Sequence, residues 1–198
     1  DVAEVYYYVR HPQMSVVEEL FKRVVNTANG AAIGTDTKMS YEVMHGNFSL
    51  LPNDTIQKIV HKNLEIAGGI SYDQEEKEYA ENIYKTFFEP DNELGTQENI
   101  RPFKTSHRYG STDVGDVSWN VPTAGLRTAT WVPGTAAHSW QAVALGATSI
   151  GLKGTELAAK VLAYSAIEII SNPSIIDSAK AEHISRVGED FIYSPLLG

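Results

Sequence analysis

The sequence predicts a mixed α/β fold, and three features of its first fifty residues lead to that prediction. Residues 2–9 are rich in Val and Tyr, which favour a strand, and Pro12 prevents its simple continuation. From Ser15 onward apolar residues recur every three or four positions, which is typical of a helix. Residues 38–45 then alternate between apolar and polar side chains, as a strand does. This strand, helix and strand make about half of a split βαβ sandwich.

Local signals predict where the first helices begin and end. Ser15 and Glu18 have the spacing of a capping box, and Gly30 is a plausible stop for that helix. Asp54 is the expected cap of a helix that reaches about residue 66, and Gly68 ends it.

The rest of the chain is predicted to alternate loops, short strands and helices. A charged amphipathic helix is expected over residues 74–88, followed by a polar loop with two prolines. Residues 117–121 and 126–132 are expected to form short strands. Packed helices are expected further on, and their ranges are 142–150, 155–170 and 173–187.

Composition excludes several classes of protein. The 198 residues carry 16 basic and 25 acidic side chains, a net charge of −9, which argues against binding to nucleic acid or to an anionic membrane. The Tyr6–Tyr8 run is therefore interpreted as a strand with one face in a core, not as a base-stacking platform. The chain has no cysteine, so a metal would need His, Asp or Glu ligands. No apolar stretch is long enough to span a bilayer, and a cytoplasmic location is expected.

Two glycines and two carboxylates lie close together in the turn at residues 110–116. Its exposed backbone N–H groups could bind an anionic group, and Asp113 and Asp116 could orient a cation or a metal-bound imidazole. An ordinary Asx-rich turn, with Asp113 as a helix cap, explains the same residues.

His138 and Arg10 are further candidates, each with two interpretations. His138 follows small residues in a loop between a predicted strand and a predicted helix, where an imidazole could bind zinc. A histidine that caps a helix or fills a core explains the same position. Arg10 ends the first predicted strand, where its guanidinium could bind a carboxylate or be an ordinary surface charge.

Three segments in combination resemble a known family: HGNFSLLPN (45–53), STDVGDVSWNVPTAG (111–125) and PGTAAHSWQAVALGATSIG (133–151). They resemble the C-terminal half of the two-metal amidohydrolases and peptidases that include aminoacylases and carboxypeptidase G. The resemblance covers essentially the whole chain. It implies that residues 1–51 are the second half of a βαββαβ lid domain that carries the homodimer contact. It also implies that residues 52–198 are the C-terminal segment of an α/β catalytic domain.

The resemblance also implies an activity and a set of roles. The intact protein would use two divalent metal ions, Zn or Mn, to activate water and hydrolyse an amide bond of a small N-acyl amino acid or peptide. His138 would be the distal metal ligand, and Arg10 would hold the substrate carboxylate. The turn lining the substrate pocket would comprise Gly110, Ser111, Thr112 and Asp113.

The family's other ligands and its general base precede the point at which this chain begins, so the chain is interpreted as a piece of a longer protein that is inactive alone. Glu18-Glu19 and Glu75-Glu76 are expected on charged helix faces and do not replace the family's Glu-Glu pair. The alternatives are a dipeptidase or aminopeptidase of the same family and a non-catalytic dimerisation module.

Overall fold

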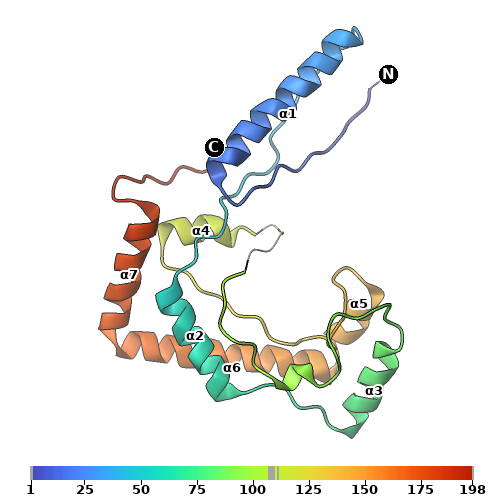
Figure 1. Cartoon of the computed structure of the whole chain (residues 1–198), viewed down its shortest axis with the longest axis vertical. Helices are drawn as coiled ribbons and strands as arrows, with labels where there is room; N and C mark the ends of the chain where they lie inside the picture. Colours follow the sequence, from blue (N-terminus) through green and yellow to red (C-terminus); the bar gives the residue numbers. More distant parts are fainter. Residues whose placement is uncertain (1, 107–109, 111, 198) are drawn as a thin grey trace. The chain divides into compact units, whose positions relative to one another are not determined.

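A computed structural model describes residues 2–106, 110 and 112–197. Within these residues the regular structure is entirely helical (Figure 1). The elements are α1 (Met14–Gly34), α2 (Asp54–Ala67), α3 (Gln74–Tyr84), a 3₁₀ helix η1 (Thr96–Glu98), α4 (Val114–Asn120), α5 (Trp140–Gly146), α6 (Ser149–Ser171) and α7 (Pro173–Val187).

The predicted α/β fold, with half of a βαββαβ lid, is therefore wrong. Residues 2–9 and 38–45 contain no assigned strand, and neither do residues 126–132. A β-strand requires a hydrogen-bonded partner, whereas alternation and β-branched residues report only a local preference. Tyr6, Tyr7 and Tyr8 are all exposed, so the prediction that this run has one face in a core is also wrong.

The chain divides into two compact units, and each is described by itself. The first contains the described residues of 1–51, 106–121 and 187–198. The second contains residues 52–105 and 122–186. The assignment of residues 1–51 to a lid and of 52–198 to a catalytic domain stays a prediction.

In the first unit, hydrogen bonds hold α4 against residues 48–49, which precede α2. Asp116 accepts a hydrogen bond from the Phe48 N–H at 3.2 Å, and Trp119 Nε1 donates to the Ser49 carbonyl at 2.8 Å. Gly115 allows this approach, since a Cβ there would lie 1.9 Å from the Phe48 carbonyl oxygen. This docking explains why residues 117–121, predicted to be a strand, belong instead to a helix and its C-cap.

Aromatic side chains complete the packing of the first unit. The Phe48 ring lies 5.4 Å from that of Trp119 and 5.5 Å from that of Tyr193. The helix α1 has no buried residue, and its Phe21 makes an edge contact with Tyr41 at 5.9 Å. The exposed apolar face of α1 is consequently only partly covered.

The second unit is built around the long helix α6, on which α2 and α5 pack (Figure 1). Gly154 brings α6 close to the 122–132 segment, because a Cβ there would lie 2.7 Å from the Ala129 carbonyl oxygen. The buried apolar core draws on these elements and on α3, and its members are Val60, Ile70, Tyr72, Ala80, Ile83, Val132, Leu145, Ile150, Leu157 and Val161.

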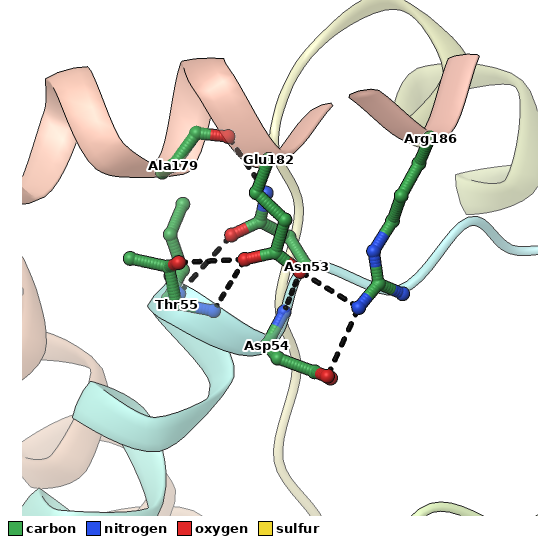
Figure 2. Close-up of polar contacts among 7 residues, drawn as sticks. Asn53, Asp54, Thr55, Ala179, Glu182 and Arg186 are labelled. Atoms are coloured by element: carbon green, nitrogen blue, oxygen red, sulfur yellow. Dashed lines mark hydrogen bonds and ion pairs between the residues drawn. The ribbon is translucent and has the colours of Figure 1, made fainter. Parts of the chain in front are cut away.

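Hydrogen bonds and an ion pair connect the beginning of α2 to α7 (Figure 2). Asn53, which is only 2% exposed, caps α2 by accepting from the Ile56 N–H and donates to the Ala179 carbonyl at 2.9 Å. The Glu182 carboxylate accepts from the N–H groups of Asp54 and Thr55 and from the Thr55 hydroxyl. It therefore satisfies N–H groups that the first turn of a helix leaves unpaired.

The helix predictions are partly confirmed. The predicted range 173–187 agrees with α7, and Gly68, with φ at 82°, ends α2 as expected. Asn53 replaces Asp54 as the cap of α2, and α3 ends four residues before residue 88. Ser15 lies inside α1, which begins one residue earlier and continues past Gly30, so the predicted capping box is wrong.

None of the helices in the described residues has the length and apolar character needed to cross a membrane.

Candidate functional site

The loop that carries His138 is tightly constrained on both sides. Before it, Gly134 adopts φ of 89° and packs so closely that a Cβ would lie 2.8 Å from the Pro90 Cβ. After it, Ser139 caps α5: its hydroxyl accepts from the Ala142 N–H at 3.2 Å and donates to the Ala136 carbonyl at 2.7 Å. His138 itself has φ of 61°, a left-handed conformation that costs about 1–3 kcal/mol in a residue other than glycine.

A hollow of about 530 Å³ opens beside the imidazole. Its lining residues come from the 122–138 segment and from α5 with its cap, and they are Trp131, His138, Ser139, Trp140, Ala142 and Val143. Strained non-glycine residues cluster at functional sites, and concave apolar surfaces with few polar groups are typical of small-molecule sites. His138 combines both features, whereas Asp36 and Glu89, which also have positive φ, do not line this hollow.

The residues described do not by themselves fit a metal centre. No three His, Asp or Glu side chains among them come together in a group that could hold an ion. His138 is exposed and supplies one imidazole, whereas structural and catalytic zinc sites use three or four protein ligands. The part of the chain that the structure describes thus offers at most one ligand at this hollow.

The turn predicted to line a substrate pocket is only partly described. Gly110 has open space around it, Ser111 lies outside the described residues, and the Thr112 hydroxyl accepts from the Val114 N–H at 3.2 Å. Asp113 is the N-cap of α4 in position, but its side chain makes no capping hydrogen bond. Gly110, Thr112 and Asp113 thus lie together on one exposed turn in the first unit.

Asp116, in contrast, has a structural role. Besides its bond from the Phe48 N–H, it is hydrogen-bonded to Tyr193; burial, this hydrogen bond and the negative charge together raise the pKa of the Tyr193 hydroxyl. This contact joins α4 to the C-terminal segment of the first unit, so Asp116 contributes to the packing of that unit.

Arg10 lies in the exposed segment that precedes α1. Its guanidinium carbon is 4.6 Å from the centre of the Tyr8 ring, which is within the range of a cation–π contact. Arg10 and the 110–113 turn belong to the first unit, and His138 belongs to the second.

One of the predicted surface glutamates is buried. Glu76 is 5% exposed and pairs with Lys153 at 2.5 Å, whereas Glu18, Glu19 and Glu75 are exposed as expected. Burial opposes ionisation of Glu76, but hydrogen bonds from Lys153, Ser149 and the Asp73 backbone hold its pKa below the usual value. Its negative charge adds to burial in raising the pKa of Tyr72 to about 12.

Sequence reasoning gave His138 as a candidate but did not predict its apolar neighbours at the hollow. Trp140 and Val143 stand three positions apart, which places them on one face of α5, and this spacing next to the histidine was the available signal. The left-handed backbone of His138 has no comparable signal, because it follows from packing around the loop.

Comparison with curated proteins finds a similarity to a hydrolase. The chain is similar to one of the subunits of p-aminobenzoyl-glutamate hydrolase from Escherichia coli (strain K12), with 31% identity over 206 residues. The match covers 91% of this chain and 43% of the relative, so the chain spans less than half of the relative's length. No family model matches the chain. No solved structure matches it.

Proposed function

We propose that this chain is part of a metal-dependent amidohydrolase that hydrolyses the amide bond of an N-acyl amino acid such as p-aminobenzoyl-glutamate. The observation that carries the proposal is the similarity to the hydrolase relative over 91% of the chain. The strained His138 at the edge of a hollow supports it independently, since strain of this kind is maintained where function requires a fixed side chain.

In this proposal His138 is one ligand of a centre that holds two divalent ions, Zn or Mn, because neutral imidazole is a common ligand of such metals. The described residues do not complete the ligand set. The remaining ligands and the general base would come from polypeptide corresponding to the part of the relative that this chain does not match. The 198-residue chain is accordingly expected to be inactive alone.

The first unit is proposed to recognise the substrate. Arg10 would bind the carboxylate of the amino-acid part, since a guanidinium forms paired hydrogen bonds with a carboxylate. The turn of Gly110, Ser111, Thr112 and Asp113 would line the pocket. Because the relative is named as a subunit, we also propose that the chain works in an assembly, with a second copy or a different polypeptide, in the cytoplasm.

The test is metal content and hydrolysis of p-aminobenzoyl-glutamate by the full-length protein and two histidine variants. His138→Ala is expected to lose about one metal ion per chain and to lower kcat at least about 100-fold, which is the size of effect seen when a group essential to catalysis is removed. His61→Ala removes a histidine that pairs with Glu65 on α2, and it should retain metal and activity.

Other results would point to other functions. Unchanged metal and activity in His138→Ala would remove His138 from the site. Hydrolysis only of substrates with a free N-terminal amine would indicate a dipeptidase or aminopeptidase. If the full-length protein neither binds metal nor hydrolyses the substrate, the proposal is refuted, and a non-catalytic interaction module is indicated instead.

A further inference from the structure

Large apolar side chains are exposed beside His138. Trp140 is 60% exposed and Val143 is 80% exposed, and both line the hollow together with Trp131. Exposed apolar side chains gathered around a concavity mark binding surfaces. The two residues project from the same face of α5, and the small Ala142 is the remaining α5 residue in the lining.

We propose that Trp131 and Trp140, together with Val143, bind a flat aromatic acyl group of the substrate beside His138. The inference rests on the proposed function for the identity of the bond that is hydrolysed. Indole rings stack favourably on other aromatic rings, and the volume of the hollow lies within the range of small-molecule pockets. The hollow therefore determines the specificity for the acyl side of the substrate.

The side chains that line the hollow suit an uncharged acyl group better than a charged amino-acid group. Among the residues that the structure describes, no Asp, Glu, Lys or Arg side chain lines the hollow, so its described lining does not complement the charge of an amino-acid carboxylate. The Ser139 hydroxyl is already occupied by its bonds to Ala136 and Ala142. Besides the indole N–H groups of the two tryptophans, His138 supplies the remaining polar side chain of the lining.

The experiment compares two substrates that differ only in the acyl group: N-(4-aminobenzoyl)-L-glutamate and N-acetyl-L-glutamate. The measured quantity is the ratio of their kcat/KM values for the full-length, metal-loaded protein. In Trp140→Ala this ratio is expected to fall about tenfold, the size of one aromatic stacking contact. Trp140→Phe, which keeps an aromatic face, should recover most of the ratio. The control is Ile167→Ala, an equally exposed apolar residue of α6 outside the hollow, which should leave the ratio unchanged.

Failure of this inference can be separated from failure of the proposed function. If the protein hydrolyses both substrates and the ratio is the same in Trp140→Ala as in Ile167→Ala, the aromatic pocket is refuted while the hydrolase remains. If neither substrate is hydrolysed, equilibrium dialysis measures how tightly the same variants bind N-(4-aminobenzoyl)-L-glutamate, which tests the aromatic pocket without hydrolysis. If Trp140→Ala binds this compound about tenfold more weakly and the other variants do not, the aromatic pocket is supported although the hydrolase activity is not. If binding is equal in all variants, or undetectable, both the pocket and the hydrolase are refuted.

Discussion

Replacing Asn53 by alanine tests the junction between α2 and α7. The buried Asn53 side chain makes two bonds in the structure: it caps α2 through the Ile56 N–H at 3.1 Å, and it donates to the Ala179 carbonyl at 2.9 Å (Figure 2). Loss of an N-cap costs about 1 kcal/mol. Loss of a buried hydrogen bond costs about another 1 kcal/mol. Asn53→Ala is therefore expected to lower the free energy of unfolding by about 2 kcal/mol.

The assay is urea unfolding followed by helical circular dichroism, with a thermal melt as a second measurement. Asn53→Ala should lower the urea midpoint with an unchanged slope, and the melting temperature should fall by about 4–8 °C for a chain of this size. Asn53→Ser should lie between the wild type and Asn53→Ala, because serine is a good cap but is too short to replace the bond to Ala179.

The control is Asn82→Ala, which removes an exposed asparagine of α3 and should change stability by less than about 0.5 kcal/mol. Equal urea midpoints for the wild type and Asn53→Ala would refute the reasoning. So would a loss in Asn82→Ala as large as that in Asn53→Ala, since burial and capping would then not be the cause.

Three further predictions concern the same unit. Gly154→Ala should destabilise the fold by about 1–2 kcal/mol, because the added Cβ clashes with the 122–132 segment. The control is Gly146→Ala, whose Cβ would meet nothing within 4 Å and which should be neutral or stabilising. Chemical denaturation compares the stability of the two variants. Lys153→Ala removes the ion-pair partner of the buried Glu76 carboxylate and should cost about 2 kcal/mol by the same assay, since the Lys153 side chain itself is 38% exposed. A loss below about 0.5 kcal/mol would show that this ion pair does not stabilise the fold. Burial opposes ionisation of Glu182, but bonds from Thr55 and two backbone N–H groups hold its pKa below the usual value. The ionised Glu182 therefore contributes fully to the free energy of unfolding above the pKa of an unfolded glutamate, about 4.3, and this contribution is lost as the pH falls through the lower pKa of the folded state. Glu182→Gln should consequently lose less stability in acid than the wild type does.

The helices could be predicted where their signals are local. The range of α7 follows from its proline at the first position, and the end of α2 follows from Gly68, which adopts a positive φ. The capping box of α3, formed by Asp73 and Glu76, is also local. The assignment of Glu76 to a charged surface was wrong because its burial depends on Lys153, which lies 77 positions further along the chain.

The strand predictions were wrong for a related reason. Val and Tyr at residues 2–9 favour extended backbone, but a strand is a property of two segments, and no other described segment forms a hydrogen-bonded ladder with this one. Residues 117–121 have β-branched and aromatic members, yet most of them are helical because Gly115 and Trp119 dock on residues 48 and 49. Local preference gave way to a tertiary contact at this position.

The geometry around His138 shows how packing can determine the conformation of a candidate residue. A left-handed histidine persists only if its surroundings fix it from both sides. On one side Gly134 is held against Phe87 and Pro90, and on the other Ser139 is fixed as the cap of α5. The backbone conformation of His138 is thus held by a loop on one side and by a helix cap on the other. Of these constraints only the histidine and its small neighbours are visible in the sequence, which is why the candidate residue could be predicted and its conformation could not.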